Sequence, residues 1–184
     1  MNMKIVRTPI EGLLVLEPKV FEDARGYFLE SFHQMRYHEA GITTGFVQDN
    51  ESKSARGVIR GLHYQINPFS QAKLVRVIEG SVFDVAVDLR QGSATFGKWF
   101  GVELSGNNKK QMFIPRGFAH GFSVLSETAV FSYKCDNYYS PLHERGILYN
   151  DPNLGVDWQI PEAEAVVSEK DKKSDLFGTI EYQF

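Results

Sequence analysis

The chain has 184 residues, of which 42% are apolar and 13% aromatic, and this is enough to bury the core of one domain. A formal net charge of −3 gives no general attraction to a nucleic acid polymer or a membrane surface, so an anionic ligand needs local cations. The single cysteine, Cys135, excludes an internal disulfide, and because neither a signal peptide nor an apolar run of roughly 20 residues is visible, we expect one domain over residues 1–184 in the cytoplasm.

The first predicted element is a short helix over residues 30–41 (ESFHQMRYHEAG), which ends at Gly41. Strand patterns then dominate, separated by turn-forming clusters such as those at 91–97 and 105–110. The strand-like segments are 58–65, 73–80, 83–89, 98–104, 111–115 and 128–135. A second short helix is predicted over residues 168–178 (SEKDKKSDLFG). Many short strands at close spacing predict an all-β sandwich or barrel.

Residues 56–65 (RGVIRGLHYQ) combine strand-like spacing with two Arg-Gly pairs and a histidine. In a strand, alternation places His63 on the face of Ile59 and Gly61, and Arg60 on the opposite face. Charged and polar groups inside a sheet cost stability unless they find partners. The segment is therefore either a solvated edge or the wall of a site, in which the glycines leave room beside the backbone for a ligand.

Two later strands carry further polar side chains on apolar faces. Lys73 shares the face of Val75 and Val77, and Tyr133 shares the face of Phe131. In residues 83–89 (FDVAVDL) the pattern is instead that of a strand with one buried apolar face and two aspartates on the other. A base such as histidine, a cation and a hydroxyl acid that face one cavity are what proton transfer next to a carbonyl requires.

Each of these residues has a simpler explanation when it is considered alone. An inward histidine such as His63 is more often a hydrogen-bonded core residue than a catalytic base. Lys73 lies near a strand start, from which its ammonium group can extend to water. Tyr133 by default packs in the core while its hydroxyl bonds to a carbonyl. The three residues on inward faces of separate strands together favour a site.

Residues 113–122 (FIPRGFAHGF) contain the pattern P-x-G-x-x-H, formed by Pro115, Gly117 and His120. This pattern resembles the second motif of the cupin superfamily, whose members are small barrels of the double-stranded β-helix type. Metal-binding cupins need H-x-H in their first motif, whereas the corresponding residues here begin with His63 and end with Gln65. Because glutamine is a weak ligand and Lys73 would repel a cation, we expect no catalytic metal.

A more specific resemblance runs from about residue 4 to the end of the chain. The segments that carry it are 23–32 (DARGYFLESF), 46–65 (FVQDNESKSARGVIRGLHYQ), 72–90 (AKLVRVIEGSVFDVAVDLR), 113–122 and 168–171 (SEKD). Together they resemble the dTDP-4-dehydrorhamnose 3,5-epimerase family. The resemblance implies an all-β, double-stranded β-helix, that is a cupin-type jelly roll or β-sandwich, with a few short peripheral helices. It implies inversion at C3 and C5 of dTDP-4-dehydro-6-deoxy-D-glucose, next to the C4 ketone, without a cofactor.

The resemblance also implies catalytic roles. His63 matches the general base and Tyr133 the proton donor on the opposite face of the sugar. Lys73 matches the group that meets the C4 oxygen as negative charge develops. Asp171 matches the carboxylate that orients the base, although the spacing Ser168-x-x-Asp171 by itself favours a helix capping box.

For the dTDP half of the substrate, the resemblance implies cations and a stacking ring. Arg25, Arg60 and Lys170 match positions near the diphosphate or sugar, and Tyr139 matches the ring that stacks on thymine. An exposed tyrosine shortly before a proline is, alternatively, a common turn residue. Further ligand-contacting positions are matched by Glu30, Gln48, Asp49, Asn50, His120 and Glu144. For Asp49 and Asn50 the competing explanation is a plain turn.

Family members are homodimers whose N-terminal segments cross to the partner sheet, so Arg25 and Glu30 are expected to serve the neighbouring subunit's site. The expected partners are thus a dTDP-sugar and a second copy of the chain, with no nucleic acid and no membrane. Two competing functions remain at this point: a mono-epimerase acting on a related dTDP-4-ketosugar, and a non-enzymatic cupin that binds sugar nucleotides. A metal-dependent cupin oxygenase ranks third.

Overall fold

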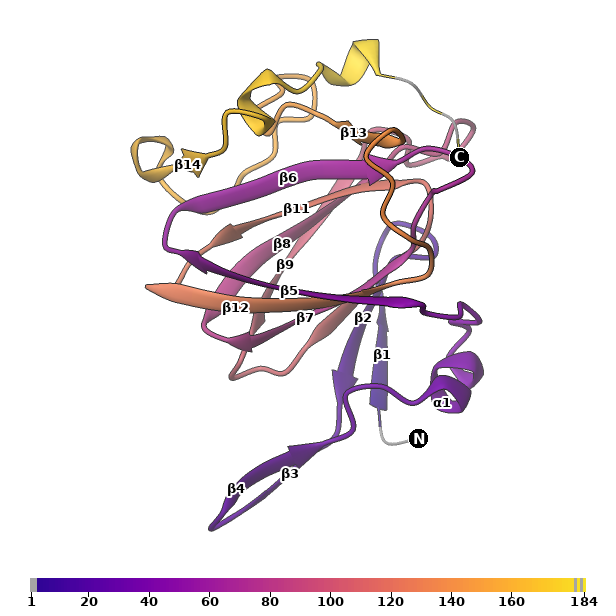
Figure 1. Cartoon of the computed structure of the whole chain (residues 1–184). Helices are drawn as coiled ribbons and strands as arrows, with labels where there is room; N and C mark the ends of the chain where they lie inside the picture. Colours follow the sequence, from indigo (N-terminus) through magenta and orange to yellow (C-terminus); the bar gives the residue numbers. More distant parts are fainter. Residues whose placement is uncertain (1–2, 181, 183) are drawn as a thin grey trace.

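The computed structural model describes residues 3–180, 182 and 184, in which two six-stranded sheets face each other (Figure 1). The first sheet has the order β1 (Met3–Arg7), β2 (Leu14–Pro18), β10 (Gln111–Ile114), β7 (Lys73–Glu79), β12 (Thr128–Cys135) and β5 (Gln48–Ala55). The second has the order β13 (Glu144–Gly146), β6 (Val58–Gln65), β11 (Phe118–Val124), β8 (Ser81–Asp88) and β9 (Trp99–Ser105), with β14 (Val166–Val167) parallel to β6. The predicted all-β jelly roll is confirmed.

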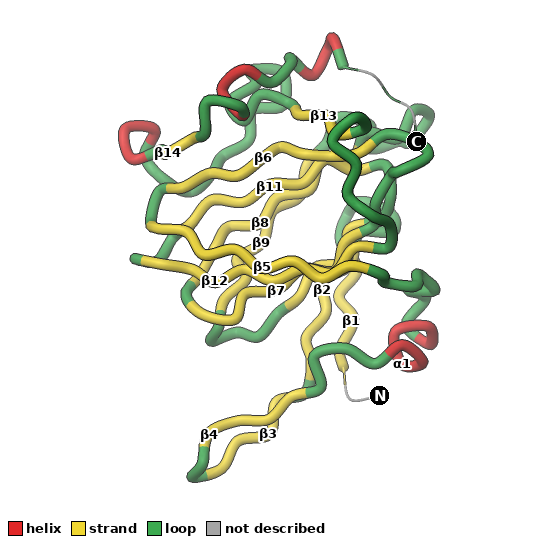
Figure 2. Tube along the Cα trace, in the orientation of Figure 1, coloured by secondary structure: helices red, strands yellow, loops and turns green. Residues whose placement is uncertain are grey.

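Helices are short and lie at the periphery of the barrel (Figure 2). They are α1 (Gln34–Glu39) and three 3-10 turns, η1 (Glu162–Glu164), η2 (Asp171–Lys173) and η3 (Phe177–Thr179). The helix predicted over residues 30–41 begins later, at Gln34, but its predicted end is confirmed, since Gly41 follows the C-cap Ala40 in the left-handed region at φ 87°. In the described part of the chain, no helix is both long and apolar enough to traverse a bilayer.

The helix predicted over residues 168–178 is wrong. The turn η2 ends at Lys173, Ser174 after it is extended, and the separate turn η3 begins only at Phe177. Asp175 then pairs with Ile147 in an isolated parallel bridge, and its carbonyl accepts a hydrogen bond from the Leu148 N–H at 2.8 Å. Because the backbone of this segment bonds to another part of the chain, it cannot also complete a helix.

One apolar core lies between the sheets. From the first sheet, the inward faces of β7 and β12 contribute Val75 and Val77, and Ala129 and Phe131, and β8, β9 and β11 of the second sheet contribute further apolar residues. Tyr133 packs against this core, as its alternation with Phe131 predicts. The two sheets therefore enclose an interior into which β7 and β12 point both apolar and polar side chains.

A second apolar core covers the outer surface of the second sheet. Leu154, Trp158 and Ile180, from the C-terminal third of the chain, pack there on Val85 and Val87 of β8. Figure 1 shows these late segments lying above β6. The prediction that β8 has only one buried face is therefore wrong: Asp84, on the other face, has no exposed surface and points into the barrel.

The register between β6 and β11 shifts within the strand. His63 pairs with His120, but Arg60 pairs with Phe122, so two residues of β6 stand opposite one of β11. This bulge turns Arg60 and His63 to the same side, where both line a cavity, and it corrects the prediction from simple alternation that they lie on opposite faces. Gly61 makes the close strand contact possible, because a Cβ at this position would lie 2.6 Å from the Gly121 Cα.

The hairpin of β3 (Val20–Asp23) and β4 (Gly26–Leu29) projects away from the barrel (Figures 1 and 2). Its aromatic side chains face solvent in the single chain, with Phe21 46%, Tyr27 55% and Phe28 68% exposed. An extended two-stranded arm of this kind has no core of its own, so its apolar side chains are available for a partner.

Candidate active site

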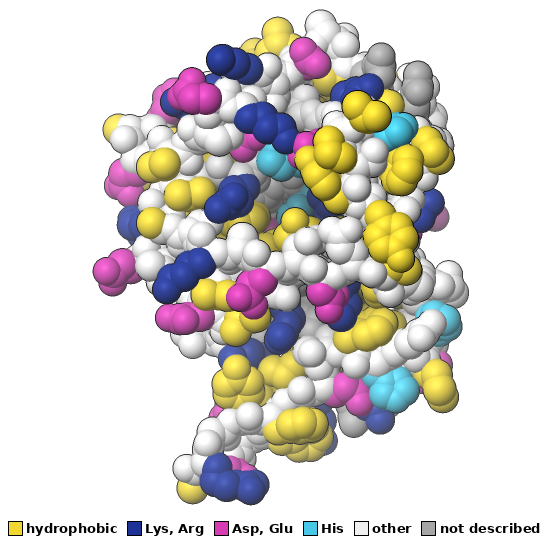
Figure 3. Space-filling view, in the orientation of Figure 1, with side chains coloured by type: hydrophobic (Ala, Val, Ile, Leu, Met, Phe, Trp, Pro, Cys, Tyr) yellow, Lys and Arg dark blue, Asp and Glu magenta, His cyan; other side chains and the backbone are white. Residues whose placement is uncertain are grey.

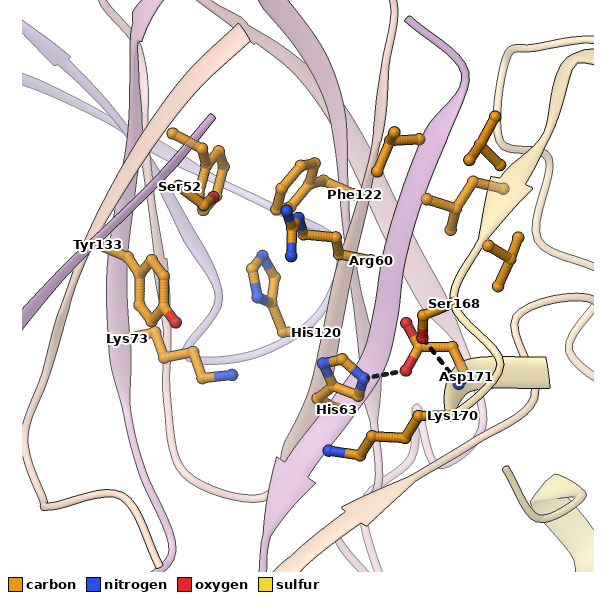
Figure 4. Close-up of a pocket in the computed structure, with 15 residues that line it drawn as sticks. Ser52, Arg60, His63, Lys73, His120, Phe122, Tyr133, Ser168, Lys170 and Asp171 are labelled. Atoms are coloured by element: carbon orange, nitrogen blue, oxygen red, sulfur yellow. Dashed lines mark hydrogen bonds and ion pairs between the residues drawn. The ribbon is translucent and has the colours of Figure 1, made fainter. Parts of the chain in front are cut away.

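A cavity of about 530 Å³ opens between the two sheets, and in the space-filling view it is a hollow with histidine side chains at its base (Figure 3). Its polar lining includes His63, Lys73, His120 and Tyr133, which come from four different strands. Figure 4 shows Lys73 and Tyr133 on one wall and His63 on the wall facing them. The structure thus brings together the three residues whose inward positions the strand patterns indicate.

His63 and Asp171 form a hydrogen-bonded pair across 108 residues of sequence. His63 Nε2 lies 2.6 Å from Asp171 Oδ1, and the Gly61 N–H points at the other carboxylate oxygen at 3.4 Å. Burial alone would raise the pKa of Asp171, but the His63 hydrogen bond and charge outweigh it and lower this pKa. A buried carboxylate behind an imidazole fixes the tautomer of the ring and stabilises the imidazolium that forms when the ring accepts a proton.

The capping explanation for Asp171 is also partly realised. The Asp171 N–H donates to Ser168 Oγ at 3.1 Å, at the start of η2. This bond fixes the backbone of the turn, while the Asp171 carboxylate remains directed at His63 (Figure 4). Ser168 therefore holds the turn that carries the carboxylate.

Lys73 has no hydrogen bond or ion pair with any residue that the structure describes. Burial lowers the pKa of its ammonium group, and the nearby Cys135, Asp84 and Glu144 oppose this change. An ammonium group that is short of partners and faces a cavity stabilises negative charge that develops on a bound oxygen.

Tyr133 is partly buried, and its hydroxyl likewise makes no hydrogen bond to the described residues. Burial raises the pKa of this phenol above its usual value near 10, so that it stays protonated at neutral pH. The protonated hydroxyl therefore lies on the wall opposite His63, where it can donate a hydrogen bond or a proton to a ligand.

His120, on β11, is held from the far side by Asp84 of β8. The two carboxylate oxygens of Asp84 lie 3.1 and 3.0 Å from His120 Nε2, and both residues are buried. Strand alternation did not predict Asp84 as a site residue, because a residue that alternates with apolar ones in this way is expected to face solvent. The one clue in the sequence to the role of Asp84 is His120, because a buried imidazole needs a hydrogen-bond partner.

An adjoining cavity of about 340 Å³ shares His63, Lys73 and Tyr133 with the first. It is also lined by residues for which the sequence predicts ligand contact, namely Gln48, Asn50, Tyr139 and Glu144. The competing explanation of a plain turn at Asp49 and Asn50 is wrong, since both residues lie in β5, where Gln48 and Asn50 share one face. The two cavities together can hold an elongated ligand.

Cations lie near both cavities. Arg60 lines the larger one, and its Nε donates to Ser54 Oγ at 3.0 Å, which leaves the outer nitrogens of the guanidinium group for a ligand. Lys170 lies 2.5 Å from Glu144, which also accepts a hydrogen bond from the Tyr139 hydroxyl at 2.8 Å. Such cations suit a diphosphate.

Three predicted site residues lie outside both cavities of this single chain. Asp49 is on the opposite face of β5, where it pairs with Lys134 at 2.9 Å. Arg25 is at the tip of the β3–β4 hairpin with 89% of its side chain exposed, and pairs with Asp23. Glu30 pairs with Arg36 at 2.5 Å.

Within the described residues, no cluster of three or more histidine, cysteine, aspartate or glutamate side chains has a geometry that would hold a metal ion. Gln65, at the position where metal-binding cupins have a ligand histidine, is used structurally. Its amide donates to the Phe69 carbonyl at 2.7 Å and accepts from the Ser140 N–H at 2.6 Å. These residues therefore do not fit a metal centre.

Comparison with known proteins gives consistent results. The profile of the dTDP-4-dehydrorhamnose 3,5-epimerase family matches residues 7–178. A dTDP-4-dehydrorhamnose 3,5-epimerase of Shigella flexneri is 52% identical over 98% of this chain and 99% of its own length. The crystal structure of such an epimerase from Elizabethkingia anophelis has a TM-score of 0.92 at 55% identity, covering 97% of this chain and 98% of its own.

A further solved structure contains a ligand. It is a dTDP-6-deoxy-D-glucose-3,5-epimerase of Legionella pneumophila in complex with dTDP-4-keto-L-rhamnose, with a TM-score of 0.94 and 54% identity. It covers 97% of this chain and 95% of its own. The barrel described here therefore has the same fold as proteins that bind a dTDP-4-ketosugar.

Proposed function

The chain belongs to the dTDP-4-dehydrorhamnose 3,5-epimerase family, and from this premise we propose that its cavity inverts C3 and C5 of dTDP-4-dehydro-6-deoxy-D-glucose. The product is dTDP-4-dehydro-L-rhamnose, a precursor of dTDP-L-rhamnose for surface polysaccharide. One observation carries the proposal: His63, backed by Asp171, faces Tyr133 across a cavity that also contains Lys73.

This arrangement suits inversion next to a ketone. Both C3 and C5 are acidified by the C4 carbonyl, so one base can serve both carbons when the ring is held appropriately. His63 removes the proton from one face, and Tyr133 returns a proton on the other face. Positioned acid and base groups of this kind contribute about 10² to 10⁴ each in rate.

Lys73 is the group proposed to meet the C4 oxygen. Deprotonation at C3 or C5 places negative charge on that oxygen as the enolate forms, and no residue described here already occupies the ammonium group. A preorganised donor at such a position is worth roughly 3 to 4 kcal/mol of transition-state stabilisation. The reaction needs no redox step, since the oxidation states of substrate and product are the same.

The dTDP half of the substrate is proposed to extend from the cationic rim of the larger cavity into the adjoining cavity. Arg60 and Lys170 supply positive charge for the diphosphate, and the Tyr139 ring provides a stacking surface for thymine. Gln48, Asn50, His120 and Glu144 add hydrogen-bonding groups. The dTDP-4-keto-L-rhamnose bound to the Legionella protein supports a dTDP-4-ketosugar as the ligand.

We also propose that the protein is a cytoplasmic homodimer. The exposed aromatic side chains of the β3–β4 hairpin would pack on the partner, and Arg25 and Glu30 would then reach the partner subunit's cavity. This explains why neither residue contributes to the cavity of its own chain. Asp49 is proposed as a further contact that depends on the dimer.

The deciding experiment is proton NMR of dTDP-4-dehydro-6-deoxy-D-glucose incubated with chelator-treated protein in D₂O. Deuterium at both C3 and C5, with the L-configured product, is the expected result. Inversion at one carbon alone would indicate a mono-epimerase. Absence of exchange at both carbons would refute the enzyme and favour a module that only binds sugar nucleotides.

A further inference from the structure

Asp84 is a buried carboxylate beneath the larger cavity, and the reaction proposed above gives it no part. It lies on β8, has no exposed surface and holds His120 Nε2 with both of its oxygens, at 3.1 and 3.0 Å. His120 is 7% exposed and lines the cavity. Its other ring nitrogen, Nδ1, makes no hydrogen bond to any described residue.

This contact determines which nitrogen of His120 carries the hydrogen. Burial raises the pKa of Asp84, while the His120 contact and the positive charge of Lys73 oppose this rise. The two oxygens lie almost equally far from Nε2, which is the geometry of one N–H shared by an ionised carboxylate. Such a carboxylate accepts hydrogen bonds only, so the hydrogen is on Nε2. Burial lowers the pKa of His120 below its usual value, although Asp84 opposes this, and the ring is neutral at pH 7. A neutral imidazole with Nε2–H has its lone pair on Nδ1, which makes Nδ1 a hydrogen-bond acceptor and excludes it as a donor.

Lys73 has the opposite character. Its ammonium group offers three donors and no acceptor, and it lines the same cavity as His120. The negative charge of Asp84 is among those that oppose the loss of the Lys73 proton on burial. The Asp84 carboxylate therefore influences both residues: it favours the charged, donating form of Lys73, and it leaves His120 Nδ1 as an acceptor.

We propose that Asp84 is a positioning residue that fixes the orientation of the ketosugar: through Asp84, His120 accepts a hydrogen bond from a sugar hydroxyl, while Lys73 donates to the ketone oxygen. A ketone placed at His120 would bring two acceptors together, and a hydroxyl placed at Lys73 would leave the ketone without its donor. A sugar ring bound in the opposite orientation, with its ketone at His120 and a hydroxyl at Lys73, thus loses the hydrogen bond to His120 and the hydrogen bond to the ketone. The proposal rests on the proposed function for the identity of the ligand, but the state of His120 does not depend on it.

The first test needs neither substrate nor a variant of Asp84. In ¹⁵N-histidine-labelled wild-type protein, long-range proton–nitrogen NMR at pH 7 reports which imidazole nitrogen carries hydrogen. The His120 signals are identified by their loss in His120→Gln. Hydrogen on Nε2 alone is expected; hydrogen on Nδ1, either as the other tautomer or as imidazolium, would overturn the proposal. Because this measurement is made on the protein without substrate, its result does not depend on whether the protein epimerises the proposed substrate.

The second test compares two fully buried aspartates of β8. Asp84→Asn removes the charge and can donate as well as accept, so His120 is expected to populate both tautomers, and kcat/KM to fall about 10- to 100-fold. Asp88→Asn, four residues along the same strand, is expected to leave the His120 signals unchanged even if stability falls. An unaltered tautomer together with unaltered kcat/KM in Asp84→Asn would refute the role of Asp84.

Discussion

Two carboxylates stand behind two histidines in this molecule, and each pair joins different elements. Asp171 reaches His63 from the turn η2, outside the second sheet, whereas Asp84 reaches His120 from a neighbouring strand within it. The first pair has a ring that is partly exposed to the cavity, and the second is almost completely buried. The more accessible ring suits proton transfer, and the buried ring suits a fixed hydrogen bond.

Asp171→Asn tests the first pair. The amide keeps the shape of the side chain but loses the charge that stabilises the imidazolium, so kcat is expected to fall about 10²- to 10⁴-fold. Steady-state kinetics measure the effect. The matched control is Glu169→Gln in the same loop, whose exposed carboxylate pairs with Lys172 and which should keep wild-type kcat. Equal kcat for Asp171→Asn and wild type would remove Asp171 from the reaction.

Tyr133→Phe tests the proton donor. Removing the hydroxyl leaves the ring in its packed position against Phe131, so substrate affinity is expected to change little. His63 can still remove protons, and deuterium should enter from D₂O, but full inversion should be suppressed because the opposite face lacks its donor. Calorimetry of binding and NMR of the product measure the two effects. Unchanged formation of the L-sugar would assign the donor to another group.

Residue patterns predicted much of this site. Lys73 and Tyr133 could be placed in the interior because each alternates with apolar residues that form the barrel core. Asp171 depended on the family resemblance, since local spacing alone favours a cap and its contact with His63 spans 108 residues. Asp84 was missed because alternation describes two faces of a strand without showing that later chain covers the outer one.

At the scale of elements, the end of β8 is fixed by one aspartate. Asp88 accepts hydrogen bonds from the Arg90 backbone and side chain, from Ser93 and from Thr95, at 2.6 to 3.0 Å. Burial would raise the pKa of Asp88, but these donors lower it from 3.8 to about 2. The turn that follows β8 is therefore held by a carboxylate that must be ionised.

This contact predicts a pH-dependent stability. A carboxyl group with a depressed pKa stabilises the fold above its unfolded pKa, near 4, and this contribution of about 2 kcal/mol is lost as the pH falls towards 2. Urea unfolding should show Asp88→Asn to be less stable than wild type by at least this amount at pH 7, with the difference narrowing below about pH 4. A difference that stays constant down to pH 3 would contradict the assignment.

Local patterns predicted the middle strands and α1 but not two other features. The C-terminal helix failed because Asp175 and Ile147 form a backbone bridge between distant segments, which no local spacing reveals. The bulge in β6 is likewise a property of two strands, since it appears only when His63 and Arg60 are matched against β11. Long-range pairing, rather than local preference, decides both features.

At the scale of the whole molecule, the β3–β4 hairpin predicts complementation between subunits. Arg25→Ala and His63→Ala variants should each be nearly inactive. In a mixed dimer, the subunit with intact His63 receives Arg25 from its partner, so one complete site forms. When the subunits combine at random, about half of the dimers are mixed and each of these has one complete site out of two. About a quarter of wild-type activity should therefore return. Differently tagged subunits, unfolded and refolded together, allow the mixed dimers to be purified and assayed.

One control and one contrary outcome define the result of that experiment. Mixing two preparations of His63→Ala should restore nothing, since no site then has a base. If purified mixed dimers of the two different variants stay inactive, Arg25 acts within its own chain or not at all. The exchange of the hairpin would then be ruled out as a source of site residues.

The long separation between His63 and Asp171 has a consequence for synthesis of the protein. By the time β12 has left the ribosome, both sheets have most of their strands, including those that carry His63, Lys73, His120 and Tyr133. The carboxylate behind the base arrives later, with the turn η2, and must dock on the outside of β6. A chain that ends before Asp171 has the strands that line the cavity but lacks the carboxylate that pairs with His63, so we expect catalytic competence only after translation has passed Asp171.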